Sequence, residues 1–311
     1  MHPVAAVPDA NSVLLAGPWS HRDYSANGIR LHVAEAGDGP LILLLHGFPQ
    51  FWWSWRHQLN TLSSAGYRVV ATDLRGYGAS DKPPRGYDAV TAAADVAGLV
   101  RALGERDAMI VGHGWGGLLA WSVGALHPRV VRALAVLSMP HPRRLRAAAL
   151  GSRQQFRAAA PLLGFQLPRY PEQRLTRNGG AHTGRLMRAW AGPAWRATPD
   201  FTDAVARYRS AIQIPQAAYG AMEYYRWAVR SLPRADGLRY IRAMAAPVTA
   251  PTLQLHGAAD TFLLPAAAVG SGRYVAAAYR WRLIDGVGHF PAEEAPEQVS
   301  AELLAWAAAP G

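Results

Sequence analysis

The stretch IVGHGWGG (residues 110–117) decides the fold, because in it an apolar run passes into a glycine-rich turn. A second apolar run, residues 118–123, follows at helical spacing. Strand, sharp turn and helix in this order predict an elbow, whose central residue holds a strained backbone conformation and raises its side chain above a sheet. The central residue here is Gly114. A turn that elsewhere carries a nucleophile therefore has no side chain to present.

Strand-like and helix-like patterns alternate on both sides of the elbow. Residues 29–34 alternate between apolar and polar side chains and predict one strand of a hairpin. Apolar runs that predict buried strands occupy residues 41–45, 68–74, 107–112, 131–138, 251–256 and 279–284. Helix-like patterns occupy residues 89–103, 118–127 and 293–309. This alternation predicts an α/β fold with a mostly parallel, doubly wound sheet.

The alternation stops after Pro140 and resumes near residue 247. Residues 141–246 contain helix-like segments rich in arginine and aromatic side chains, broken repeatedly by proline, and no strong strand pattern. We therefore expect a core domain formed by residues 1–140 and 247–311. The segment between them, 141–246, is expected to form an inserted helical cap.

Composition excludes several kinds of site. The chain has 311 residues and no cysteine, so disulfides, cysteine metal sites and a cysteine nucleophile are excluded. No cluster of histidine or carboxylate residues has metal-ligand spacing, and no cofactor is expected. Residues 1–10 lack a secretory pattern, and no apolar run approaches the roughly 20 residues needed to span a bilayer. A cytoplasmic protein is the expectation.

The positive charge is concentrated in the predicted cap. The chain carries a net charge of +11, and residues 141–242 hold 18 arginines against 5 acidic residues. A coding bias towards arginine is one interpretation. A basic surface for an acidic small molecule, or for peripheral contact with a membrane, is the other. No nucleic-acid motif appears, so nucleic acid is not an expected partner. Both a monomer and a homodimer remain open.

Two loops would supply backbone donors at the elbow. HGFP (residues 46–49) follows the first buried strand. In a fold with an elbow, this loop and the residue after the elbow centre each contribute an N–H group to an oxyanion hole. Those donors would be the amides of Phe48 and Trp115.

A histidine and an aspartate follow the elbow in the order expected for a catalytic pair. Asp260 lies just beyond a predicted strand, and His289 lies in GVGHF (residues 286–290), after the last strand. The carboxylate would hold the imidazole in the tautomer that accepts a proton, so that His289 acts as general base. His113, beside the elbow, is expected to be a structural hydrogen-bonding residue.

Five strings together resemble one family. They are HGFPQFWWSWRHQ (46–58), DLRGYGASDKP (73–83), GHGWGG (112–117), the loop of Asp260, and GHF (288–290). Over about residues 20–309 the chain resembles the epoxide hydrolase group of the α/β-hydrolases. In that group an aspartate at the elbow attacks the epoxide to form an ester. A His–Asp pair then activates water to hydrolyse it, and two cap tyrosines bind the epoxide oxygen.

The resemblance carries over only in part. Asp260 and His289 match the His–Asp pair, and Tyr225 falls where the family places one cap tyrosine. Its neighbour Tyr224 is expected to contact the substrate, as is Trp53 in the tryptophan-rich segment, whose apolar walls suit an apolar molecule. The position of the second cap tyrosine falls on Pro161, and Gly114 occupies the nucleophile position.

Three functions remain open from the sequence. The first is slow hydrolysis of an apolar small molecule by water that the pair of His289 and Asp260 activates. The second is a lyase or cofactor-free oxygenase reaction in which the pair removes a proton. The third is a catalytically inactive protein that binds a ligand or a partner. Ser138, after the strand that follows the elbow helix, is a less favoured substitute nucleophile.

Overall fold

The computed structural model describes residues 7–308. Within this range one eight-stranded sheet forms in the order β1-β2-β4-β3-β5-β6-β7-β8. The strands are β1 (Ser20–Ala26), β2 (Ile29–Ala36), β3 (Leu41–Leu45), β4 (Arg68–Thr72), β5 (Ala108–His113), β6 (Val131–Leu137), β7 (Thr252–Gly257) and β8 (Tyr279–Ile284). β1 pairs with β2, and β2 with β4, in antiparallel fashion, whereas all later pairs are parallel. The prediction of a mostly parallel sheet is confirmed.

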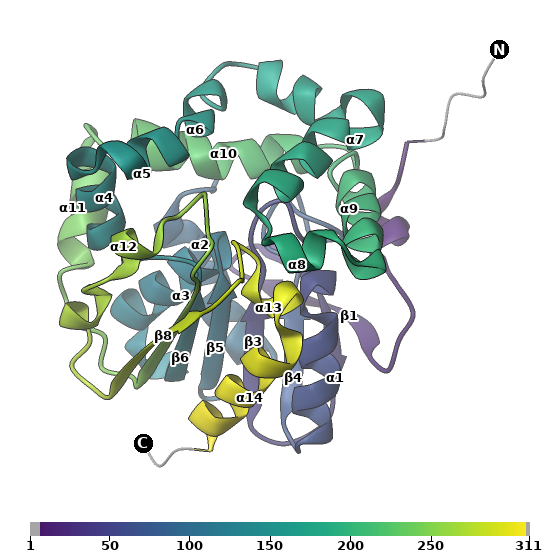
Figure 1. The fold of residues 1–311 in the computed structure, drawn as a ribbon. Coiled ribbons are helices and arrows are strands. Elements are labelled where there is room, and N and C mark those ends of the chain that lie inside the picture. Colours follow the sequence, from purple (N-terminus) through teal and green to yellow (C-terminus); the bar gives the residue numbers. More distant parts are fainter. Residues whose placement is uncertain (1–6, 309–311) are drawn as a thin grey trace.

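Helices cover both faces of this sheet, which explains why its central strands are continuously apolar. Every residue of β3 and β5 is buried. The helices α2 and α3 pack together on one face, and α1 and α14 on the other (Figure 1). The helices of the core are α1 (Arg56–Ser64), α2 (Ala89–Ala102), α3 (Trp115–Leu126), α12 (Pro265–Ala268), α13 (Pro291–Glu294) and α14 (Pro296–Ala307). Short 3-10 turns are η1 (Ala10–Val13), η2 (Trp52–Trp55), η3 (Pro128–Val130) and η4 (Ser271–Tyr274).

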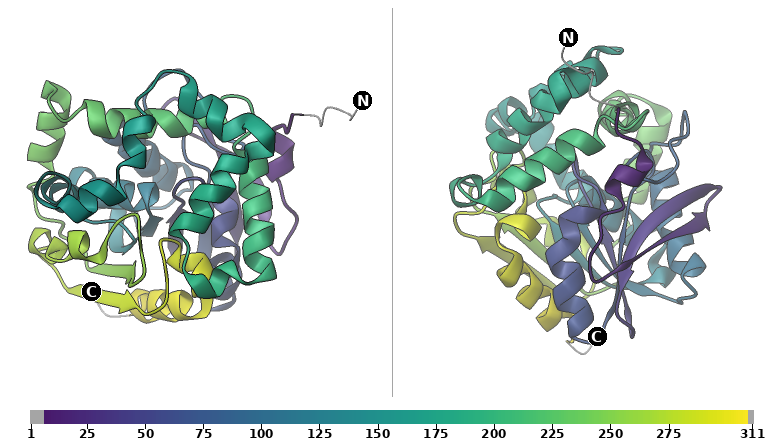
Figure 2. Two further views of the ribbon diagram at one scale, coloured as in Figure 1. Left: turned by 45° about the horizontal axis from the view of Figure 1, so that its top comes forward. Right: turned by 90° about the vertical axis from the view of Figure 1, so that its right-hand side faces the viewer.

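A layer of helices between β6 and β7 lies over one end of the sheet (Figures 1 and 2). These helices are α4 (Pro142–Gly151), α5 (Arg153–Ala158), α6 (Pro161–Gly164), α7 (Tyr170–Trp190), α8 (Pro193–Arg196), α9 (Pro199–Ala211), α10 (Ala217–Arg230) and α11 (Ala235–Ala243). Residues of α4, α10 and α11 share a cavity with Gly114, at the carboxyl end of β5. The layer therefore covers the edge of the sheet where the elbow lies, and we refer to it as the cap.

Two elements differ from the sequence-based expectation. Strand β1 is not predicted by the sequence, because most of its residues are exposed and it lacks a clear apolar alternation. The C-terminal segment, expected as one helix over 293–309, forms α13 and α14 with a break at Ala295. Pro296 explains the break, because a proline disfavours helical geometry in the residue before it. Residue 309 of the expected helix lies outside the described residues.

None of the helices within residues 7–308 combines the length and the hydropathy that crossing a membrane requires.

Candidate active site

The elbow is present between β5 and α3. Gly114 adopts φ 52° and ψ −117°, a left-handed conformation that non-glycine residues rarely enter. Three backbone hydrogen bonds fix the turn. The Gly114 N–H donates to the Leu137 carbonyl (3.1 Å), the Leu118 N–H to the Gly114 carbonyl (3.0 Å), and the Gly116 N–H to the His46 carbonyl (3.0 Å). The turn is therefore tied to both neighbouring strands as well as to its own helix.

The glycines of the elbow differ in what surrounds them. A Cβ at Gly112 would collide with the Gly116 carbonyl, and one at Gly116 would collide with the Leu45 carbonyl. A Cβ at Gly114 would instead meet only ordinary contacts, 3.6 Å from the Gly47 Cα and 3.7 Å from the His289 Nε2. Packing requires glycine at positions 112 and 116. At 114 there is space for a side chain, and that space faces His289.

Asp260 and His289 form the hydrogen-bonded pair that the sequence predicts. The His289 Nδ1 lies 2.8 Å from the Asp260 Oδ2. The other carboxylate oxygen, Oδ1, accepts the backbone N–H groups of Phe262 (2.9 Å) and Leu263 (3.0 Å). Because Asp260 is held on both sides, its carboxylate fixes the Nδ1–H tautomer of a neutral His289 and turns Nε2 towards Gly114.

Burial and charge act in opposite directions on Asp260. Burial disfavours its ionised form, but the charge of His289 and hydrogen bonds from His256 and His289 outweigh burial and hold the pKa of the carboxyl below its ordinary value. The His256 Nε2 lies 2.7 Å from the Leu263 carbonyl and 3.4 Å from the Asp260 Oδ2. Asp260 is therefore ionised at neutral pH, as an orienting carboxylate must be.

The loop of His289 is held by a residue that the sequence did not reveal. The Glu294 carboxylate accepts the N–H groups of Gly288 (2.7 Å), Phe290 (2.9 Å) and the cap residue Gly192 (2.8 Å). The His289 N–H itself donates to the carbonyl of Trp190, also in the cap (2.9 Å). The position of the histidine thus depends on the cap as well as on β8.

A buried polar chain runs behind the pair. The His113 Nε2 lies 2.7 Å from the His289 carbonyl, and its Nδ1 lies 2.8 Å from the Gln50 Oε1. The Gln50 amide donates to Glu293 (2.5 Å), which also pairs with Arg56 (2.6 Å). Burial, reinforced by the neighbouring His289, lowers the pKa of His113 to about 3. His113 therefore acts as a structural hydrogen-bonding residue, in agreement with the expectation.

The two expected oxyanion donors lie at the same place. Phe48 and Trp115 line the cavity together with Gly114 and His289. Trp115 begins α3, so its N–H has no acceptor within the helix. Neither amide donates to an acceptor within residues 7–308. Both are thus free to bind an oxygen above the elbow, although that role itself stays a prediction.

A single cavity connects the elbow to the cap. Its volume is about 190 Å³, and it extends from Gly114 and His289 along α10 to the space between α4 and α11. Most of the lining is apolar, including Leu118, Met139 and Phe262. A cavity of this kind, with a few convergent polar groups at one end, is typical of a small-molecule site.

Comparison with known proteins agrees with this architecture. The family described as "alpha/beta hydrolase fold" matches residues 40–296. The chain belongs to the α/β-hydrolase family. It is 36% identical to the AB hydrolase superfamily protein YfhM of Bacillus subtilis (strain 168), over 77% of this chain and 81% of the relative. It is 33% identical to epoxide hydrolase 4 of Mus musculus, over 90% and 76%.

The solved structures agree. The structure of epoxide hydrolase A from Mycobacterium thermoresistibile is 32% identical, with a TM-score of 0.76 over 93% of this chain and 98% of that one. Within the α/β-hydrolases, the chain therefore falls in the epoxide hydrolase group.

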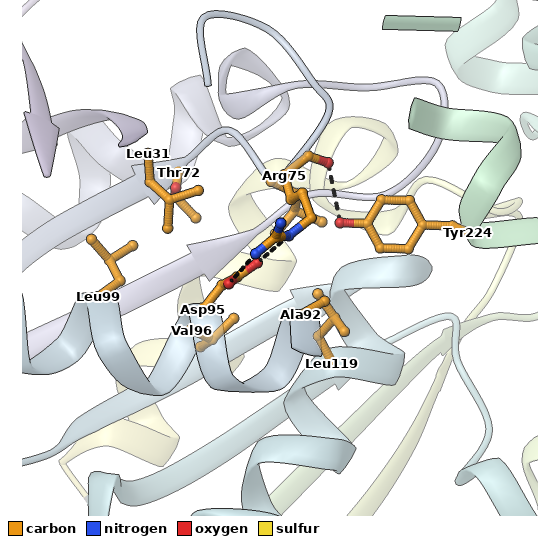
Figure 3. A pocket seen from close by; sticks show the side chains of 10 residues that line it. Leu31, Thr72, Arg75, Ala92, Asp95, Val96, Leu99, Leu119 and Tyr224 are labelled. Atoms are coloured by element: carbon orange, nitrogen blue, oxygen red, sulfur yellow. Dashed lines mark hydrogen bonds and ion pairs between the residues drawn. The ribbon is translucent and has the colours of Figure 1, made fainter. Parts of the chain in front are cut away.

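Of the two cap tyrosines named from the sequence, only Tyr225 lines this hydrolase cavity. Neighbouring residues on a helix point about 100° apart, so Tyr224 faces elsewhere. Its hydroxyl donates to the Arg75 carbonyl (3.1 Å), next to the ion pair of Arg75 with Asp95 (2.6 Å), at a separate cavity of about 10 Å³ (Figure 3). The expectation that Tyr224 contacts a substrate is therefore corrected, since it anchors α10 to the core.

Trp53 is also placed away from the cavity lining. Its ring lies beneath the guanidinium groups of Arg56 (3.8 Å) and Arg207 (4.7 Å) and packs edge-on against Tyr208. Trp53 therefore joins the core to α9, and the expectation that it contacts a substrate is corrected.

The position expected for the second cap tyrosine offers no hydroxyl. Pro161 is exposed at the start of α6, and its neighbour Leu162 lines the cavity instead. Neither Pro161 nor Leu162 carries a hydroxyl. This segment of the cap therefore brings no side-chain hydrogen-bond donor to the cavity from these two positions.

Proposed function

We propose that this α/β-hydrolase opens a small apolar epoxide in one step, with water as the nucleophile. The observation that carries the proposal is the 3.7 Å between the His289 Nε2 and the Cβ position of Gly114. A water in the space above Gly114 lies within reach of Nε2, and the cavity is large enough to hold water together with a substrate. In this reaction water attacks the epoxide directly from the space that a side chain at position 114 would occupy.

Each side chain then has one task. His289, oriented by Asp260, removes a proton from the water as its oxygen attacks an epoxide carbon. The Tyr225 hydroxyl donates a proton to the epoxide oxygen as the ring opens. Burial raises the pKa of Tyr225, which keeps it protonated at neutral pH. Without a covalent intermediate or a second tyrosine, we expect slow turnover.

The cavity also suggests what kind of molecule enters. Arg146 of α4 is the arginine among the lining side chains, and within residues 7–308 no carboxylate forms an ion pair with it. We propose that the substrate is apolar over most of its length and carries an acidic group at the end that reaches Arg146. In this proposal the excess of arginine in the cap draws acidic molecules to the cavity.

Ligand binding without turnover is the second candidate. It is favoured by Pro161 at the position that the resemblance gives to the second cap tyrosine, because a single tyrosine stabilises a developing alkoxide less well than two. A binder would retain the cavity and Arg146 but would not depend on the orientation of His289.

Diol formation from styrene oxide separates the two candidates. We expect the wild type to form phenylethanediol above the spontaneous rate, and His289→Ala to lower that excess by at least about 100-fold, as the loss of a general base does. Tyr224→Phe is the matched control, because Tyr224 lies outside the cavity. An unchanged rate in a folded His289→Ala variant would refute the proposal, and no excess rate in the wild type would favour the binder.

A further inference from the structure

The space above Gly114 has the donors of an anion site. Phe48 and Trp115 line the cavity, their N–H groups have no acceptor within residues 7–308, and the second lies at the N-terminus of the 12-residue helix α3. A helix N-terminus carries partial positive charge and favours an anion. A helix N-terminus alone does not indicate a ligand site, but here a buried side chain also points at the same space.

That side chain is His289. Its side chain is 3% exposed, and its Nδ1 is engaged by Asp260. Its Nε2 has no hydrogen-bond partner within residues 7–308 and lies 3.7 Å from the Cβ position of Gly114. In its protonated form Nε2–H donates towards this space, where a Cβ at position 114 would meet only ordinary contacts. Aromatic side chains, among them Phe48 and Phe262, contribute to the walls of the cavity.

We propose that this space binds a small monocarboxylate, of the size of formate or acetate, which supplies the nucleophile that position 114 lacks. A carboxylate fits better than a tetrahedral anion, because it is planar and its two oxygens can divide the donors. One oxygen takes the Phe48 and Trp115 amides, and the other faces the bound epoxide. The net charge of +11 raises the local concentration of such anions.

The chemistry balances without any further reagent. A carboxylate oxygen forms a bond to an epoxide carbon, the epoxide C–O bond breaks, and its electron pair goes to the epoxide oxygen, which takes the proton of Tyr225. The product is a hydroxyalkyl ester. His289, having released its proton to solvent, then removes a proton from water, whose oxygen adds to the ester carbonyl. Collapse of that intermediate breaks the acyl C–O bond, returns the proton from His289 to the leaving alkoxide, and releases diol and carboxylate. Tyr225 regains its proton from solvent.

The inference rests on the proposed function for its second step, because the same His289 must activate water. An isotope label separates the two. The oxygen that attacks the epoxide stays with the alkyl carbon, so ¹⁸O from labelled acetate appears in the diol. Direct attack by water leaves the diol free of that label. We expect labelled diol from the wild type with ¹⁸O-acetate and styrene oxide, with a rate at least about tenfold above that without acetate.

Binding is measured independently by titrating sodium acetate calorimetrically. We expect millimolar affinity in the wild type and in Tyr224→Phe, and at least about tenfold weaker binding in Gly114→Asp, whose own carboxylate occupies the space and repels another. Diol that forms without label at saturating acetate overturns the inference and leaves the proposed function standing. If no diol forms at all, the proposed function fails. In that case the carboxylate site is still supported if the wild type binds acetate and Gly114→Asp does not. It is overturned if both proteins bind acetate equally or if neither binds it.

Discussion

Placing a carboxylate at the elbow is the sharpest perturbation that the structure suggests. Gly114→Asp adds a Cβ that meets only ordinary contacts, 3.6 Å from the Gly47 Cα and 3.7 Å from the His289 Nε2. The backbone is already at φ 52°, so no rearrangement is needed. A non-glycine residue in such a conformation costs about 1–3 kcal/mol. We therefore expect a folded variant that is less stable than the wild type by about that amount.

Gly114→Asp should raise the rate of epoxide hydrolysis, although it lowers the stability of the protein. A nucleophile fixed on the elbow replaces a mobile water, and proximity of this kind can contribute about 7–11 kcal/mol when geometry is ideal. In the proposed reaction Tyr225 alone donates to the epoxide oxygen, so we expect the gain from proximity to be smaller than this. A gain of about 3 kcal/mol corresponds to roughly 100-fold in kcat/KM. That is the increase in styrene oxide hydrolysis expected for Gly114→Asp over the wild type.

The assay combines kinetics with a label. In a single turnover in H₂¹⁸O, the wild type should place solvent oxygen in the diol. Gly114→Asp should instead place an unlabelled oxygen of its own carboxylate there, and rapid acid quenching should trap an ester on the peptide that contains position 114. Gly114→Ala is the matched control, because it adds the Cβ without the carboxylate. A folded Gly114→Asp protein with no rate gain and no trapped ester would refute the view that the remaining site is of the epoxide hydrolase type.

Three further predictions follow from single contacts. Asp260→Asn should lower the excess rate of diol formation by at least about 100-fold, since the amide no longer fixes the tautomer of His289; circular dichroism checks that the fold is intact, and an unchanged rate would contradict the pairing. Tyr225→Phe should slow epoxide opening at least about tenfold but leave hydrolysis of an activated ester unchanged, whereas Tyr224→Phe should change neither and should cost about 1 kcal/mol in urea unfolding. Burial raises the pKa of Glu293 despite Arg56, Tyr208 and Gln50. Folding therefore favours the protonated form of Glu293. The stability that this protonation contributes is fully present below the pKa of Glu293 in the unfolded chain, and it is lost as pH rises through the higher pKa of the folded protein. The difference in unfolding free energy between wild type and Glu293→Gln should therefore move in favour of the variant as pH rises through that window, and a difference independent of pH would contradict it.

The parallel core could be predicted because its strands are buried on both faces. An all-apolar run such as β3 followed by HGFP, or β5 followed by the elbow, carries its signal in a few consecutive residues. The hydrogen bond between His289 and Asp260 could also be predicted, since both follow strands that end at the same edge of the sheet. Strand β1 could not, because an exposed edge strand has no apolar period.

The supporting contacts of the site left no such local signal. Glu294 binds amides of the histidine loop and of Gly192, which is about 100 residues away in sequence, and only the fold brings them together. Tyr224 and Tyr225 are adjacent and chemically identical, and the rotation of α10 alone decides that the second lines the cavity. The sequence also gives no local signal for the surroundings of Trp53. A tryptophan beside the HGFP loop suits a pocket wall, but two arginines, from α1 and α9, cover its ring.

The glycines of the elbow show that packing alone does not account for residue 114. At 112 and 116 any Cβ would strike a backbone carbonyl, so those glycines are demanded by the close approach of strand and helix. At 114 the space is open, and what a side chain would meet there is the Nε2 of His289. Glycine lowers the strain of the left-handed turn, and the pair of His289 and Asp260 lies beside it. The elbow thus combines an open space at residue 114 with a hydrogen-bonded pair beside it, and this combination is why we propose a mobile nucleophile, water or a small carboxylate, for this site.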